Sequence, residues 1–226
     1  MSNITYKYIK SNKEVQTYIS MADASLSSIG YTEHSNAHVE KAAQTAYMIL
    51  STLGYPEREC ELAQIAAYMH DIGNVINRID HAQSGAIMAF RLLSNLGMPA
   101  EEIAIIVSAI GNHDESTAYP VNPIAAALII ADKTDVRRSR VRKPLVEDDA
   151  VGVQRIHDRV NYACVESNVY ISEDKTAFVL EVTIDENISS IMEYFEIFME
   201  RMKLCRNAAK TLKLEFHLVI NNKSIV

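Results

Sequence analysis

Apolar residues recur at helical spacing through the first two thirds of the chain, and glycine or proline interrupts them at regular points. These runs predict helices over about residues 11–28, 37–53, 57–71, 80–96, 99–111 and 123–135. Ser11 and Glu14 have the spacing of a capping box, which places the start of the first helix there. Residues 1–10 alternate weakly and fit either a short strand or a docked arm.

The hydrophobic period changes near residue 161. Alternating β-branched residues predict strands over 162–171 and 177–184, with a polar turn between them, and a closing strand over 214–220. A long amphipathic helix is expected over about 188–212, and a shorter one over about 149–160. The sequence therefore predicts a mainly α fold, in which a helical bundle (residues 1–145) is followed by a small α/β domain (residues 146–226) made of a β-hairpin, a long helix and a strand.

The composition excludes several classes of protein. The chain has 226 residues, 48% of them hydrophobic, and a net charge of −7, so no overall basic field draws it to nucleic acid. Its three cysteines include no CxxC pair, which is typical of a reducing compartment. The N-terminal residues contain no signal sequence, and the longest apolar run, 124–131, is too short to cross a bilayer. We expect a cytoplasmic protein that binds neither membranes nor nucleic acid.

Histidine and aspartate side chains fall at the predicted ends of several helices. The candidate metal ligands are His38, His70, Asp71, His81, His113 and Asp132. In an up-and-down bundle joined by short loops, the start of one helix and the end of the next lie at the same pole. The placement is consistent with one shared site.

Asp132 is the most diagnostic member, because it follows the apolar run Ala125–Ala131. A buried carboxylate is costly unless it is paired or bound to a metal. A salt bridge to Lys133 or to one of the following arginines explains it equally well. His70 taken alone is more typical of a core histidine than of a ligand. Structural roles are expected for the remaining histidines and for one acid. His34 is expected to cap a helix and Glu33 to be a solvated charge. His157 is expected on an exposed helix face, and His217 on a strand.

Four histidines and two carboxylates suit a transition metal better than calcium. We expect iron or manganese foremost, with zinc, cobalt, nickel and magnesium as alternatives. Six ligands are too many for one catalytic zinc ion, whereas two ions bridged by Asp71 fit the number. A pair of ions about 3.5–4 Å apart can clamp phosphoryl oxygens.

The order His38, His70-Asp71 and Asp132 resembles the HD superfamily of metal-dependent phosphohydrolases, which is named after the His-Asp doublet. The segments around His81 and His113 resemble those of members with dinuclear sites. The resemblance covers about residues 30–140. It implies that one ion is held by His38, His70, Asp71 and Asp132, and a second by Asp71, His81 and His113. It further implies that a bridging hydroxide attacks phosphorus, with Asp71 as the catalytic residue that orients this water.

Two departures and one basic segment bear on the substrate. Asn74 stands where cyclic-dinucleotide relatives carry lysine, and the Gly-Tyr-Pro motif of that subgroup is absent, as is the glutamate-aspartate pair of (p)ppGpp hydrolases. Arg138, Lys133 and Arg137 follow the last ligand closely and are candidate substrate-binding residues, since guanidinium groups bind phosphate well. The alternative for these residues is a solvated face, or a bridge to the acidic residues 147–149.

We therefore expect hydrolysis of a phosphoester in a small molecule, with a nucleotide as the favoured substrate. The alternative is a catalytically quiet HD domain that binds a nucleotide and acts as a sensor. The long helix and the strand edges of the second part suit either a homodimer contact or a lid.

Overall fold

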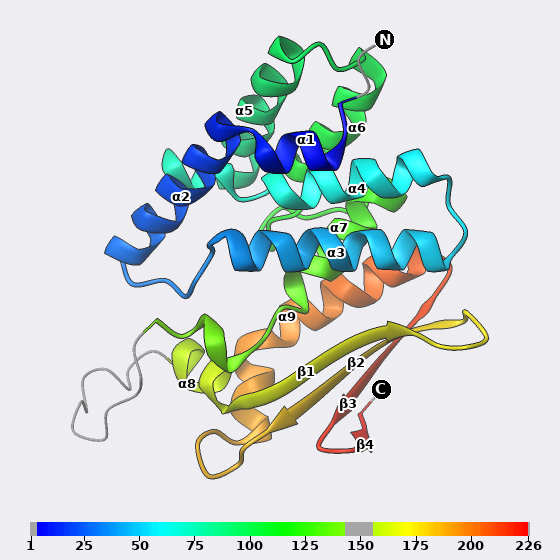
Figure 1. Ribbon diagram of the computed structural model, residues 1–226. Coiled ribbons are helices and arrows are strands. Elements are labelled where there is room, and N and C mark those ends of the chain that lie inside the picture. The colour runs from blue at the N-terminus through cyan, green and yellow to red at the C-terminus, as the bar shows by residue number, and fades with distance from the viewer. Residues whose placement is uncertain (1–3, 143–155, 226) are drawn as a thin grey trace.

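The computed structural model in Figure 1 describes residues 4–142 and 156–225. Helices form the first part of the chain, in the order α1 (Tyr6–Ser11), α2 (Lys13–Ser28), α3 (Asn36–Thr52), α4 (Glu57–Met69), the 3-10 helix η1 (Ile72–Val75), α5 (His81–Asn95), α6 (Ala100–Gly111), α7 (Pro123–Lys133) and the 3-10 helix η2 (Arg138–Arg140). The second part consists of α8 (Ile156–Ala163), β1 (Cys164–Ile171), β2 (Ala177–Ile184), α9 (Ile191–Thr211), β3 (Glu215–Ile220) and β4 (Lys223–Ser224).

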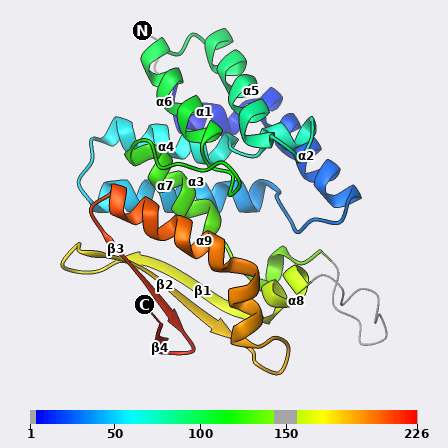
Figure 2. The ribbon, with the colours of Figure 1, turned by 180° about the vertical axis from the view of Figure 1, so that it is seen from behind.

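The four strands form one sheet in the order β1-β2-β3-β4. β1 and β2 pair antiparallel as a hairpin, whereas β2 and β3 pair parallel, because α9 carries the chain back across one face of the sheet. α9 lies between this sheet and α7, and α8 and β1 also contact the first part of the chain, at η2 and α3 (Figures 1 and 2). The expected mainly α fold with a small α/β part is confirmed.

Hydrophobic packing is continuous between the two parts. Ile65 of α4, Leu128 of α7, Leu180 of β2 and Phe198 of α9 are all fully buried and belong to the same core cluster. α7 explains this continuity, since nearly all of its residues are buried and it packs against α3 and α4 on one side and α9 on the other. The sheet and the bundle are therefore positioned relative to each other by a shared core.

The N-terminal residues differ from the expectation. Residues 6–11 form the short helix α1, and Asn12, whose backbone is extended, separates it from α2. The side chain of Asn12 accepts hydrogen bonds from the backbone N–H groups of Glu14 and Val15. The predicted capping box at Ser11 is therefore wrong by one residue, because Ser11 still belongs to the last turn of α1.

Two expectations fall partly on residues outside the described ranges. Of the helix predicted over 149–160, the structure describes only the portion from Ile156, where α8 begins. Lys143 and the acidic residues 147–149 lie outside the described residues. In the portions 4–142 and 156–225, no helix has both the length and the apolar character that crossing a bilayer requires.

Candidate metal centre

The structure brings the six candidate ligands together at one end of the helical part. They come from helix termini: His38 from the first turn of α3, His70 and Asp71 from the end of α4, His81 from the start of α5, His113 from the residues after α6, and Asp132 from the last turn of α7. All four histidine side chains are buried. The helix backbones thus direct polar groups into a site that the apolar core surrounds.

The carboxylate of Asp71 lies between two pairs of histidines. Its Oδ2 is 3.7 Å from Nε2 of His38 and 3.2 Å from Nε2 of His70. Its Oδ1 is 3.5 Å from Nε2 of His81 and 4.0 Å from Nε2 of His113. One carboxylate therefore presents a separate oxygen to each histidine pair, which is the arrangement a bridging ligand requires.

Asp132 divides its two oxygens in a similar way. Oδ1 is 3.3 Å from Nε2 of His38 and 3.6 Å from Nε2 of His70. Oδ2 is 2.7 Å from Nζ of Lys133. The two alternatives that the sequence left open for Asp132, a ligand and a salt bridge to Lys133, are thus compatible, with one oxygen serving each.

All four histidines donate the proton on Nδ1 away from the site. The acceptors are Oδ2 of Asp135 for His38 (2.8 Å) and backbone carbonyls for the other three: Ala67 for His70 (2.7 Å), Arg78 for His81 (3.0 Å) and Ile110 for His113 (2.6 Å). These bonds fix the tautomer in which Nε2 carries a lone pair. Metal-binding histidines are usually held in this way.

The inward-facing atoms suit a cation. Within the described chain, Nε2 of His38, Nε2 of His70 and Oδ2 of Asp71 are buried without a hydrogen-bond partner. Nε2 of His81 lies 3.2 Å from Nε2 of His113, so two lone pairs face each other. Buried acceptors without donors are costly. Groups of three donor atoms within 4.8 Å of one another occur in His38–His70–Asp71, His70–His113–Asp132 and Asp71–His81–His113, and they fit a divalent metal.

Electrostatics keeps His113 and the two carboxylates in their metal-binding forms. Burial lowers the pKa of His113 to about 3, so this ring is neutral. Burial alone would raise the pKa values of Asp71 and Asp132, but attraction to His70 at Asp71, and to Lys133 and His70 at Asp132, outweighs it and holds both carboxyls well below their usual range. At His70 burial lowers the pKa, but Asp71 and Asp132 raise it to about 10, so this ring carries a proton that a cation bound at Nε2 would replace.

A close backbone approach places His81 beside the His-Asp doublet. A Cβ atom on Gly73 would lie 2.0 Å from the carbonyl oxygen of His81 and 2.5 Å from the backbone nitrogen of Gly85. Only glycine therefore allows η1 to approach the first turn of α5 this closely. Asn74, the next residue, donates from Nδ2 to Oδ1 of Asp71 at 2.9 Å and orients the bridging carboxylate.

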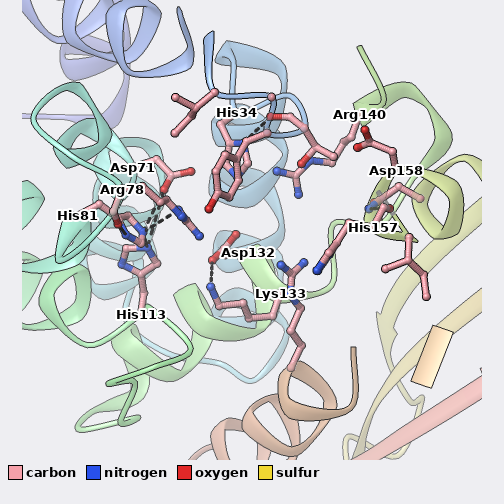
Figure 3. Close-up of a pocket in the computed structure, with 17 residues that line it drawn as sticks. His34, Asp71, Arg78, His81, His113, Asp132, Lys133, Arg140, His157 and Asp158 are labelled. Carbon is pink, nitrogen blue, oxygen red and sulfur yellow. Dashed lines mark hydrogen bonds and ion pairs between the residues drawn. The ribbon is translucent and has the colours of Figure 1, made fainter. Parts of the chain in front are cut away.

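The ligand cluster opens onto a cavity of about 350 Å³ between the helical part and α8 and α9. Figure 3 shows Asp71, His81 and His113 on one side of this cavity and His157 and Asp158 on the other. In the described portion, four cationic side chains line it: Arg78, Lys133, Arg140 and Arg201. A cavity of this size suits a small ligand, and its cationic lining favours an anionic one.

The candidate substrate-binding residues differ in where they lie. Lys133 lines the cavity, whereas Arg137 and Arg138 lie outside its lining. Arg137 is engaged by Asp135, from its Nε to Oδ1 at 2.8 Å. Arg138 donates to the carbonyl of Tyr162 at 2.6 Å and stacks over that ring. The short turn of η2 after α7 directs these two side chains to protein partners.

Several expected structural roles also need correction. His34 is not the cap of α3, because Ser35 caps that helix through its side chain. The ring of His34 lies against that of His38 and lines the cavity. Glu33 is not a solvated charge, since it pairs with Arg137 at 3.6 Å. The expectation for His157 is confirmed, since it is exposed on α8, and from there it also lines the cavity.

Three functional candidates were missed in the sequence: Asp135, Arg78 and Arg201. Asp135 comes three residues after Asp132, about one helical turn, so both residues are expected on the same side. This spacing could have indicated a second buried carboxylate near the site. Arg140 is buried and donates to the carbonyls of Glu33 and Asp135 at 3.0 Å each. Arg201 reaches the cavity from α9, and only the tertiary packing of α9 reveals this.

The comparisons with known proteins bear on this site. The sequence profile of the HD domain matches residues 37–137. Residues 37–137 form an HD domain. All six candidate ligands lie in the matched range, and the family resemblance found in the sequence is confirmed. HD domains bind divalent metals, and the buried donor groups described above fit such a site.

One similar solved structure is the crystal structure of a predicted HD superfamily hydrolase from an uncultured Thermotogales bacterium. It shares 23% sequence identity with this chain, with a TM-score of 0.44, over 64% of this chain and 72% of that one. None of the curated proteins that were compared matches the chain.

Proposed function

We propose that this protein is a metal-dependent phosphohydrolase that cleaves a phosphoester of a small molecule, for which a nucleotide is the favoured substrate. The observation that carries the proposal is the position of Asp71, whose two carboxylate oxygens face two separate histidine pairs beside a cationic cavity. The family supports the coarser class, a metal-dependent hydrolase. Two ions of iron or manganese suit the donor set best, with zinc, cobalt, nickel and magnesium as alternatives.

When bound, the ions would supply an activated water and neutralise charge on the phosphoryl oxygens. The chain itself performs the remaining tasks. Asp71, held by Asn74 at 2.9 Å, orients the attacking water and acts as the catalytic residue. Lys133 keeps Asp132 ionised through a 2.7 Å contact, and its ammonium group lines the cavity, where it can bind a phosphoryl oxygen.

The far side of the cavity supports a substrate larger than phosphate. Arg140 and Arg201 line the cavity and can bind further anionic groups, although both are far from the His-Asp doublet in the sequence. Tyr31, Ile29 and Ile156 add an aromatic and apolar lining, which suits the flat ring of a base. This combination of cationic and apolar groups favours a nucleotide over a simple sugar phosphate.

The test is turnover by the purified protein loaded with Mn²⁺ or Fe²⁺, across a panel of nucleotides, other phosphomonoesters and phosphodiesters. We expect hydrolysis of at least one nucleotide, at a rate that falls by at least about a hundredfold in Asp71→Ala. Tight nucleotide binding without turnover, in protein shown to hold metal, would instead favour a catalytically quiet sensor. Metal-loaded protein that neither binds nor hydrolyses any member of the panel refutes both alternatives.

Metal content provides a second test of the same site. Elemental analysis should find two ions in the wild-type protein, one in His81→Ala and none in Asp71→Ala, because Asp71 serves both histidine pairs and His81 only one. His217→Ala is a matched control, since this exposed histidine lies on β3 and pairs only with Glu215 among the described interactions. An Asp71→Ala protein that keeps both ions contradicts the bridging role.

A further inference from the structure

The two ends of the metal centre differ in what already contacts their donor atoms. At one end, Nε2 of His38 and Nε2 of His70 have no hydrogen-bond partner in the described chain. At the other end, Nε2 of His81 is 3.3 Å from Nη1 of Arg78. Because Nδ1 of His81 donates to a carbonyl, its Nε2 accepts this contact from the guanidinium. The arginine thus uses the lone pair that a cation at this end requires.

Arg78 contacts His81 through both of its functional groups. Its backbone carbonyl accepts from Nδ1 of His81 at 3.0 Å, and its side chain reaches Nε2 of the same ring. Nη1 of Arg78 is also 3.4 Å from Oδ1 of Asn74, the residue that holds Asp71. The guanidinium is therefore a positive charge placed against the triad Asp71–His81–His113, and it opposes a second positive charge there.

The guanidinium also has partners other than His81 beside it. It lies 5.4 Å from the ring centroid of Tyr31, and Nη2 is 4.0 Å from Oδ1 of Asp114. It lines the cavity in which the substrate is expected, and its side chain is about a quarter exposed, at 26%. An anion in the cavity can therefore draw the guanidinium away from His81 without leaving it unpaired.

We propose that Arg78 makes occupation of the Asp71–His81–His113 triad by a cation conditional on an anionic group in the cavity. This inference rests on the two-ion site of the proposed function. The His38–His70–Asp71 triad takes its ion unopposed, whereas the second triad takes its ion when Arg78 turns to an oxyanion. Binding of the second ion and of the phosphorylated ligand is then mutually favourable, since linkage requires that each strengthens the other equally.

The experiment is calorimetric titration of the metal-stripped full chain with Mn²⁺, alone and with saturating inorganic phosphate. In the wild type, phosphate should raise the affinity for the second ion by about tenfold, the factor that corresponds to one hydrogen bond to a charged group. The affinity for the first ion should not change. In Arg78→Gln the second ion should bind about tenfold more tightly without phosphate. Phosphate should then have little further effect. Arg91→Gln, on the exposed face of α5, is the matched control and should behave as the wild type.

Three outcomes overturn the proposal. One is an Arg78→Gln protein whose second-ion affinity and phosphate response match those of Arg91→Gln. Another is weaker binding of the second ion in Arg78→Gln than in the wild type, which would mean that the arginine helps this ion to bind. The third needs only the wild type: an exchange-coupled Mn²⁺ pair that appears in its electron paramagnetic resonance spectrum at the same Mn²⁺ concentration with and without phosphate. If the wild type binds a single Mn²⁺ even with phosphate, the two-ion site of the proposed function fails as well.

Discussion

Asp135 offers a sharp test of how the site is built, because it supports a ligand without facing the metal centre itself. Its side chain is fully buried, and Oδ2 accepts from Nδ1 of His38 at 2.8 Å. Its carboxylate also pairs with Lys41 at 3.0 Å, Arg137 at 2.8 Å and Arg140 at 3.9 Å. The change Asp135→Asn keeps the shape of the side chain and removes only its charge.

The size of the effect follows from the hydrogen bond to His38. A bond to a charged acceptor contributes about 1.5–3 kcal/mol and a bond to a neutral one about 1, so the amide loses about 0.5–2 kcal/mol. This difference corresponds to a loss of about 2- to 30-fold in affinity for the ion that His38 binds. Its upper end overlaps the range of about 10- to 100-fold found for outer partners of metal-binding histidines. The second ion should be affected less, because His38 lies only in the first triad.

The assay is Mn²⁺ titration of Asp135→Asn beside Arg137→Gln as a matched control. Arg137 contacts the same carboxylate from its more exposed side and does not contact His38. We expect affinity for the first ion to stay within about twofold in this control. Thermal unfolding of both variants shows whether each is folded at the temperature of titration. A folded Asp135→Asn protein that binds the first ion as tightly as the control would refute the role assigned to Asp135.

Two further changes test the packing beside the site and an ion pair between the first turns of α4 and α6. Gly73→Ala should lower the free energy of unfolding by about 1–3 kcal/mol, since the new Cβ would meet backbone atoms. Gly111→Ala is the control, because its Cβ finds only an ordinary contact at 3.7 Å and should leave the unfolding midpoint unchanged or higher. Equal midpoints for the two variants would contradict the close approach at Gly73. The hydrogen bond from Arg58 lowers the pKa of Glu102, so this carboxylate stabilises the fold above pH of about 4.3, and the contribution disappears as the pH falls through the lower folded-state pKa. The difference in midpoint between wild type and Glu102→Gln should therefore be largest near pH 7 and shrink as the pH falls through the folded-state pKa of Glu102, with Glu101→Gln as the exposed control.

The sequence predicted most helices well because their ends carry local signals. Gly30, Gly54 and Gly97 adopt positive φ just after α2, α3 and α5, where a residue with a side chain would be strained. Pro123 opens α7 as expected. Helix α1 was not predicted, because six residues carry too little periodicity for a reliable pattern.

Asp132 joins the other ligands at one pole for a reason that the sequence did not show. If each helix of the bundle simply reversed the direction of the one before it, the end of α7 would lie at the opposite pole from the end of α6. The segment between His113 and Pro123 runs away from the site, and the carbonyl of Pro120 accepts from Thr211 at the end of α9. Helix α7 therefore starts at the far side and returns, which brings Asp132 back to the ligand cluster.

Substrate recognition could not be derived from the motif, because the residues that form the cavity come from separate elements. The profile match ends at residue 137, yet His157 and Asn161 on α8 and Arg201 on α9 line the same cavity as the ligands. Their approach depends on the packing of α9 between α7 and the sheet. The ligand set is local to helix termini and can be found by residue type and order. Selectivity depends on the second part of the chain, so relatives with the same six ligands and a different second part are expected to act on different substrates.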